Sequence, residues 1–335
     1  MASVLGKRWL AAAICIMAAL LIAAPPQAMG RGNVREEAED FPPGKFSDGG
    51  TYQLENFRGK VVVVFLYESN CPRCAGLIPQ RNEVVAAYKD KPVVFLAVGA
   101  GDSAQSVTSY VRKTGLVMPV FIDPLSVMER RLDVKISMNN IYAFRVIGPD
   151  GKISGYDMTP QAIDKALKDV TWKYKEKGYH EQLNPIIELL EWGQYEKAVP
   201  ALRQWRSNHK KDVAESAQKL YDAVQAEGQA WKEEADAAVE TDPVKAYDLY
   251  VKLAAAFKGE DLGKAADAAR RPLANNPTVK KELAARPHFD RLNAMMAQAQ
   301  PANKKSITAY LQELIQTYPD TPTATKAKKL LEDLT

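Results

Sequence analysis

The sequence predicts an α/β domain of alternating strands and helices, followed by an all-α domain. In the first half, short runs of β-branched and apolar residues such as 61–67 and 92–98 alternate with segments of helical spacing. From about Trp172 these runs disappear, and Ala, Lys, Glu, Leu and Gln dominate. The length of 335 residues also fits two domains, at roughly 150 residues per domain.

The N-terminal stretch has the pattern of a secretory signal peptide. Lys7 and Arg8 precede an apolar segment at 9–24, and small residues surround position 29. We therefore expect residues 1–30 to be a signal peptide and the protein to be exported to the periplasm or cell envelope. An uncleaved signal anchor is the alternative and the only membrane attachment expected, although the apolar run is short for a span. Residues 31–44 are charged and predicted to be a flexible leader.

The net charge and the positions of the cysteines limit the classes of function that the protein can have. Removal of Lys7 and Arg8 lowers the formal net charge from +4 to +2, and no clustered basic face indicates nucleic-acid binding. Cys15 lies in the signal segment, so Cys71 and Cys74 are the cysteines of the mature protein. A disulfide over so short a loop restrains little of the unfolded chain, so the pair fits redox chemistry better than a structural framework.

The chain is organised around the transition from strand 61–67 through Glu68-Ser69-Asn70 into Cys71-Pro72-Arg73-Cys74. Proline after a polar cap favours the first position of a helix, which places Cys71 at a helix N-terminus. There the helix dipole favours the thiolate, and Cys74 is placed to resolve a mixed disulfide. The stretch therefore predicts thiol-disulfide exchange with protein thiols and disulfides.

The rest of the α/β domain is predicted from the same periodicity and turn signals. We expect a hairpin with a glycine-rich turn at 41–54 and a helix from 72 to about 90 that is kinked at Pro79. Further strands are expected at 92–98, 117–122, 141–147 and 152–154, and further helices at 103–114, 124–132 and 160–169. Such alternation indicates a partly parallel sheet that is covered on both faces.

Five features carry a family resemblance: residues 59–64, the Cys-Pro-Arg-Cys sequence at 71–74, Pro79, the strand at 119–123 and the hairpin at 146–153. In these, Lys45 to Asp169 resembles a thioredoxin-fold domain of the TlpA/ResA type, within the alkyl hydroperoxide reductase/thiol-specific antioxidant group. The resemblance implies a three-layer thioredoxin-like domain over 45–171. It also implies that Cys71 attacks and Cys74 resolves, with their redox-active disulfide in place of a cofactor.

Two positions depart from that family's pattern. The position of its cis-proline is held by Tyr142, so Tyr142 and the adjacent Ile141 are expected in a loop that faces the substrate. The positions of its proton-handling carboxylate fall on Phe65 and Leu77. Glu68 is the nearest acid in sequence and the candidate for proton handling, with an exposed turn residue as the alternative.

The flanking residues and the cysteines each have a second interpretation. Arg73, with Pro72, is expected to modulate the thiol pair by favouring a thiolate, and the alternative is a solvated arginine. The cysteines alternatively form a structural disulfide in a degenerate domain, or half of a zinc site. Zinc needs four ligands, and His180, His209 and His288 are scattered without metal-ligand spacing, so no metal is expected.

Residues 172–335 are predicted to form stacked αα-hairpins of a tetratricopeptide-like kind. Three segments read as helix end, polar turn and helix, with an alanine at a matching position in each: 202–224 with Ala217, 251–273 with Ala266, and 311–334 with Ala327. Stacked helical repeats often bind peptides or proteins, so a partner on this domain is expected, besides an unidentified upstream redox partner. The rival function is a non-catalytic envelope protein-binding module on a degenerate thioredoxin-like scaffold.

Overall fold

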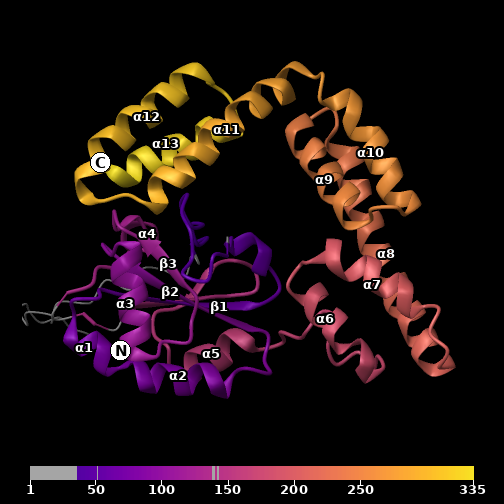
Figure 1. The fold of residues 1–335 in the computed structure, drawn as a ribbon, viewed down its shortest axis with the longest axis horizontal. Helices are drawn as coiled ribbons and strands as arrows, with labels where there is room; N and C mark the ends of the chain where they lie inside the picture. Colours follow the sequence, from indigo (N-terminus) through magenta and orange to yellow (C-terminus); the bar gives the residue numbers. More distant parts are fainter. Residues whose placement is uncertain (1–35, 51, 138–139, 142) are drawn as a thin grey trace, which may run out of the picture. The chain divides into compact units, whose positions relative to one another are not determined.

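A computed structural model describes residues 36–50, 52–137, 140–141 and 143–335. The predicted signal peptide and Tyr142 lie outside the described residues. The first part of the chain forms a mixed sheet (Figure 1), and the order of its strands is β3-β2-β1-β4-β5. Its strands are β1 (Val61–Tyr67), β2 (Val93–Ala100), β3 (Val120–Asp123), β4 (Ala143–Ile147) and β5 (Ile153–Gly155). Strands β1, β2 and β3 are parallel, and β4 and β5 are antiparallel to their neighbours.

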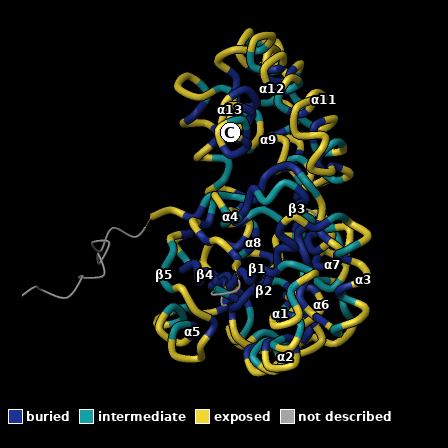
Figure 2. Tube along the Cα trace, turned by 90° about the vertical axis from the view of Figure 1, so that its left-hand side faces the viewer, coloured by how far each residue is buried: buried dark blue, intermediate teal, exposed yellow. Residues whose placement is uncertain are grey.

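Helices and the N-terminal segment cover both faces of this sheet, as the alternation predicted. The helices of this part are α1 (Pro72–Gly76), α2 (Ile78–Ala87), α3 (Ala104–Thr114), α4 (Val127–Arg131) and α5 (Pro160–Leu167), besides the 3-10 turn η1 (Leu54–Phe57). Alternate residues of β1 enter two different apolar clusters, and every residue of the strand is buried (Figure 2). One cluster contains Ile78, Val107 and Ile163 of α2, α3 and α5, and the other contains Met128 of α4.

Three predicted helix starts are confirmed. The side chains of Cys71, Ser103 and Thr159 each accept a hydrogen bond from a backbone N–H in the first turn of α1, α3 and α5. The kink expected at Pro79 is a break at Leu77, because Pro79 lies in the first turn of α2, where a proline needs no hydrogen-bond donor.

The hairpin expected at 41–54 is wrong for the residues that the structure describes there. The glycine-rich turn is present, since the Phe46 N–H donates to the Gly50 carbonyl at 3.2 Å, but no strand follows it. Phe46 instead bridges to Phe121 of β3, and the Phe46 ring lies 5.0 Å from the ring of Phe41. Burial of these aromatic rings against the sheet takes the place of pairing between the two arms of the turn.

Residues 36–44 also differ from the flexible leader that their charge suggested. The Ile153 N–H donates to the Glu36 carbonyl at 2.9 Å, and the Ala38 N–H donates to the Gly151 carbonyl at 2.9 Å. Phe41 is 4% exposed. One buried aromatic residue and two backbone hydrogen bonds therefore hold a segment whose mean composition is polar.

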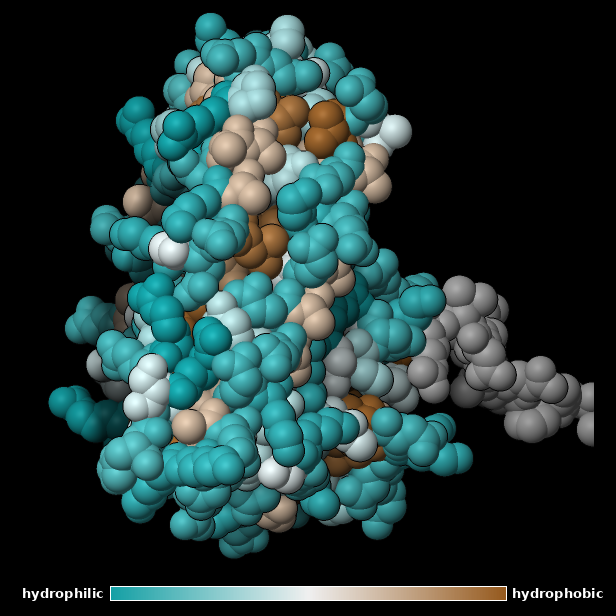
Figure 3. Space-filling view, turned by 90° about the vertical axis from the view of Figure 1, so that its right-hand side faces the viewer, coloured by the Kyte–Doolittle hydropathy of each residue, from teal (hydrophilic) through white to brown (hydrophobic). Residues whose placement is uncertain are grey.

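The second part of the chain is helical throughout its regular structure. Its helices are α6 (Asn184–Glu191), α7 (Tyr195–Trp205), α8 (Lys211–Ala238), α9 (Pro243–Ala256), α10 (Asp261–Leu273), α11 (Pro277–Ala297), α12 (Lys304–Thr317) and α13 (Pro322–Leu334), with 3-10 turns η2 (Glu181–Leu183) and η3 (Pro301–Asn303). Each of the three predicted repeat segments spans two consecutive helices, and Ala217, Ala266 and Ala327 are fully buried. The face shown in Figure 3 is mostly hydrophilic, with apolar side chains gathered in small patches. Within the described residues no helix is both long and apolar enough to cross a bilayer.

Several ion pairs of the described residues join the helical region to the α/β part, and two of them are largely buried. The Lys60 Nζ, just before β1, lies 3.5 Å from the Glu191 Oε2 of α6. The Arg131 Nε of α4 donates to the Asp333 Oδ2 of α13 at 2.7 Å. Val127 of α4 also packs in the apolar cluster of α11, α12 and α13. The sheet is thus held from both the beginning and the end of the helical region.

Candidate active site

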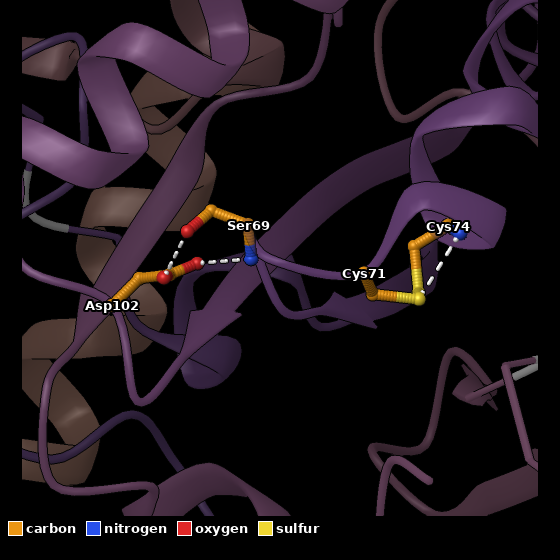
Figure 4. The surroundings of a disulfide bond; sticks show 4 residues. All are labelled: Ser69, Cys71, Cys74 and Asp102. Carbon is orange, nitrogen blue, oxygen red and sulfur yellow. Dashed lines mark hydrogen bonds between the residues drawn. A yellow bond between two sulfur atoms is a disulfide. The ribbon is translucent and has the colours of Figure 1, made fainter. Parts of the chain in front are cut away.

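Cys71 and Cys74 form a disulfide at the carboxyl end of β1 (Figure 4). Their Cα atoms are 5.3 Å apart, and Cys71 is the N-cap of α1. The Cys71 Sγ accepts the backbone N–H of Cys74 at 3.1 Å. The Cys71 N–H in turn donates to the Glu68 carbonyl at 3.1 Å and closes the turn that leaves the strand. In the reduced protein the same amide would face a thiolate on Cys71.

The two sulfurs differ in their accessibility. Cys71 is partly exposed, whereas Cys74 is 0% exposed and packs in the apolar cluster that contains Phe65 and Ile78. Burial of the pair is therefore limited to the second cysteine. A molecule that approaches the pair from solvent meets the Cys71 sulfur.

A groove of about 540 Å³ opens beside Cys71. One wall comes from the turn and α1, and the other from α3. The lining residues are Ser69, Asn70, Cys71, Pro72, Ala75, Gln105, Ser106, Ser109, Tyr110 and Lys113, and Cys74 is not among them. The groove therefore leads to the first cysteine alone.

Asp102 supports this turn and was missed in the sequence analysis. It follows β2, is 8% exposed, and accepts the Ser69 N–H at 2.8 Å and the Ser69 hydroxyl (Figure 4). Burial raises the pKa of the Asp102 carboxyl, and the two hydrogen bonds from Ser69 oppose that rise. Asp102 therefore anchors the residue two positions before Cys71 to the neighbouring strand.

Two tyrosines lie against this anchor. The rings of Tyr67 and Tyr110 stack with centroids 4.2 Å apart at 15°. Both hydroxyls are buried and have no hydrogen-bond partner among the described residues. Burial, followed by the charge of Asp102, raises the pKa of both phenols. Both therefore stay protonated near neutral pH and carry no charge at the site.

Glu68 is half-buried on the turn before Cys71. Burial, and then the negative charges of Glu129 and Asp102, raise the pKa of its carboxyl. The positions at which the resembling family has its carboxylate are apolar, since Phe65 is 0% exposed and stacks on Phe144 at 5.0 Å, and Leu77 packs against the same cluster.

The other predicted site residues are divided between surface and core. Pro72 and Arg73 are exposed on the first turn of α1. Ile141 is 5% exposed and packs in the cluster that contains Cys74, and Tyr142 lies outside the described residues. Arg81, which the sequence analysis did not single out, is 6% exposed, and its guanidinium lies 4.3 Å from the Phe144 ring centroid. A buried cation thus lies near the ring that stacks on Phe65.

A dithiol at the start of a helix, at the carboxyl end of the central strand of a mixed sheet, defines a thioredoxin-like protein. The AhpC/TSA family model matches residues 34–155, and the chain belongs to this family. It is 32% identical over 127 residues to Thiol-disulfide oxidoreductase ResA of Bacillus thuringiensis (strain Al Hakam), which is 37% of this chain and 71% of the relative.

Other similar proteins cover different shares of the chain. ResA of Geobacillus kaustophilus (strain HTA426) is 33% identical over 75 residues, which is 22% of this chain and only 43% of that relative. A solved structure of a thiol:disulfide interchange protein of the thioredoxin family from Chlorobium tepidum TLS has 21% identity and a TM-score of 0.34, and the match covers 40% of this chain and 97% of that one. The family model ends at residue 155 and does not reach the helical region, and each of these three matches covers less than half of this chain.

Proposed function

We propose that this protein is an exported thiol-disulfide oxidoreductase that exchanges electrons with protein disulfides through Cys71 and Cys74. The observation that supports it best is the difference between the sulfurs, since Cys71 is partly exposed and Cys74 is 0% exposed. One sulfur within reach of a substrate and a second held behind it suit attack followed by resolution. Export to the periplasm or envelope rests on the signal-like segment at 1–30.

The reaction starts from the reduced pair. The N–H of Cys74 and the start of α1 stabilise a thiolate on Cys71, which attacks one sulfur of a substrate disulfide. The substrate S–S bond breaks as the Cys71–substrate bond forms, and the leaving sulfur takes up a proton. Cys74 then loses its proton and attacks the Cys71 sulfur, which releases the second substrate thiol. Two electrons pass to the substrate, and the pair ends as the disulfide seen in the structure.

The disulfide itself is the redox group of this proposal, so no other cofactor takes part. A thiol donor returns the pair to the dithiol by the same exchange in reverse. Glu68 is the candidate acceptor of the Cys74 proton, because it is half-buried on the turn and burial raises the pKa of its carboxyl. Arg73, exposed beside Cys71, favours the thiolate form.

A trapping experiment tests the roles of the two cysteines. Cys74→Ser and Cys71→Ser are each mixed with insulin, and the wild type is assayed for insulin reduction with dithiothreitol as donor. Cys74→Ser is expected to accumulate a mixed disulfide with insulin, whereas Cys71→Ser is expected to form none. Circular dichroism checks that both variants are folded. A wild-type protein without reductase activity, or equal trapping by both variants, would refute the proposal.

A non-catalytic partner-binding function is the second candidate. It is favoured by the apolar residues Phe65 and Leu77 at the carboxylate positions of the resembling family. In that case the helical region, which we propose to be tetratricopeptide-like, does the recognition. A partner retained equally by the wild type and by a Cys71→Ser/Cys74→Ser double variant, in a protein without exchange activity, would favour it.

A further inference from the structure

The groove beside Cys71 has walls of unequal chemistry. The wall from the turn and α1 carries the reactive sulfur, and the wall from α3 is polar, with Gln105, Ser106 and Ser109 on it. Gln105, Ser109 and Lys113 follow each other at intervals of four residues, so they lie along one face of α3. At 1.5 Å per residue the row is about 12 Å long, which matches roughly four residues of extended chain.

Lys113 is the one charged residue among the ten that line this groove. It is exposed and makes no ion pair with any described residue. Asp102 does not line the groove, and both of its oxygens accept hydrogen bonds from Ser69, which does. Tyr110 adds no charge, because burial raises the pKa of its phenol. The side chains that line the groove therefore carry a net positive charge, on Lys113.

We propose that this groove holds the polypeptide segment next to the substrate disulfide, and that Lys113 selects segments with acidic side chains. The inference rests on the proposed oxidoreductase function and names the substrate class for it. Hydroxyl and amide groups from Asn70, Gln105 and Ser109 suit the main chain of an extended segment, while Lys113 contacts a carboxylate at the far end of the row. Lys113 is thus a specificity-determining residue that takes no part in the exchange itself.

The test uses three synthetic peptides, each with one internal disulfide, that differ only in having Glu, Gln or Lys at the flanking positions. The reduced protein is mixed with each, and the second-order rate constant of peptide reduction is measured at low and high salt. The wild type is expected to reduce the Glu peptide about two- to fivefold faster than the Lys peptide at low salt. High salt is expected to close the gap.

Variants of Lys113 test whether this residue causes the preference for the Glu peptide. Lys113→Gln is expected to abolish the Glu preference, and Lys113→Glu to reverse it. Arg112→Glu is the matched control, because Arg112 is the preceding residue of α3, is exposed, and does not line the groove. Its peptide ratio is expected to equal that of the wild type.

Three results would overturn the inference. The first is an equal ratio of Glu to Lys rates in Lys113→Glu and wild type, and the second is an equal change in Arg112→Glu and Lys113→Glu. The third uses oxidised glutathione, a small disulfide with carboxylates, as a further substrate: a Lys113 effect on glutathione without one on the peptides rejects the peptide assignment. A wild type that reduces none of the peptides instead refutes the proposed function itself.

Discussion

Ser69 gives both of its hydrogen-bond donors to Asp102, which lies 33 positions later in the chain. The Ser69 N–H is 2.8 Å from one carboxylate oxygen, and the Ser69 hydroxyl donates to the other. This contact fixes the turn before Cys71 to the end of β2. The position of the attacking sulfur therefore depends on a residue outside the Cys-Pro-Arg-Cys sequence.

Removal of that anchor is expected to slow the reaction of Cys71. Asp102→Ala leaves two Ser69 donors unsatisfied, and we expect iodoacetamide to alkylate reduced Cys71 about three- to tenfold more slowly. Asp102→Asn keeps an acceptor for the Ser69 N–H and is expected to lose less. Ser103→Ala is the matched control, because Ser103 caps α3 next door without contact to Ser69. Equal rates in Asp102→Ala and Ser103→Ala would contradict the anchoring role.

The contact between Arg131 and Asp333 is expected to contribute strongly to stability. Both side chains are less than a tenth exposed, at 8% and 6%, so Asp333→Ala leaves a buried cation without its main partner. We expect a loss of about 3 kcal/mol in the free energy of unfolding, measured by urea denaturation.

Lys329→Ala is the control for this pair. Lys329 lies in the same helix, is 45% exposed, and pairs with Glu39 at 3.0 Å and with Asp333 itself at 4.0 Å, so it tests the exposed side of the same network, and its removal is expected to cost less than about 1 kcal/mol. A loss for Asp333→Ala as small as that for Lys329→Ala would show that the buried pair does not join α4 to α13.

Asp123 is expected to make stability depend on pH. It is 1% exposed and accepts the N–H groups of Val127 and Met128 at 2.9 and 2.8 Å. Burial raises the pKa of its carboxyl from 3.8 to about 6, so the folded state holds a proton that the unfolded state has lost in this range. The contribution of Asp123 to stability is therefore full below a pH of about 4 and is lost as the pH rises through about 6.

The comparison with Asp123→Asn isolates this carboxyl. Relative to the variant, the wild type is expected to lose about 3 kcal/mol of unfolding free energy between about pH 4 and pH 7, measured by urea denaturation across that range. The variant also loses one backbone acceptor, but that loss does not change with pH. Parallel pH profiles for the two proteins would show that Asp123 does not titrate there.

Gly263 is expected to tolerate no side chain, although it lies inside a helix. A Cβ at this position of α10 would lie 2.1 Å from the Phe257 carbonyl oxygen. Alanine is normally the better helix former by about 1 kcal/mol, so a fall in melting temperature for Gly263→Ala would reveal the close approach to the end of α9. Gly76→Ala in α1 is the control, since no atom lies within 4 Å of its added Cβ, and it is expected to gain stability. A gain in both variants would contradict the packing.

Signals between residues close in sequence correctly predicted where helices begin. The prolines at 72 and 160 marked helix starts that the structure confirms, because each acts through its own backbone neighbours. The helix expected at 103–114 is also present, with Ser103 as its N-cap. The segment at 41–54 was misassigned since its aromatic residues pair with distant Phe121, which no local pattern shows.

The contact between Asp102 and Ser69 could have been predicted only if the neighbouring strands of the sheet had been known. It ends the run Gly99-Ala100-Gly101 after a buried strand, which on its own indicates a turn. The carboxyl ends of adjacent parallel strands meet at one edge of a sheet, so an acid after β2 lies near the turn after β1 only if the two strands are neighbours. The sequence analysis did not predict that β1 pairs with β2. It therefore could not predict the contact of Asp102 with Ser69.

The two outer strands of the sheet, β3 and β5, have four and three residues. β3 pairs with Ala97–Ala100 of β2 on one side and is bridged by Phe46 on the other, and Pro119, directly before it, has no N–H to extend the ladder. Short edge strands offer few backbone groups to a strand of another chain, which is one way in which sheets avoid edge-to-edge aggregation. Strand addition at the two edges of the sheet around the thiol pair is therefore disfavoured, which leaves side-chain surfaces such as the groove beside Cys71 as the place for contact with other proteins.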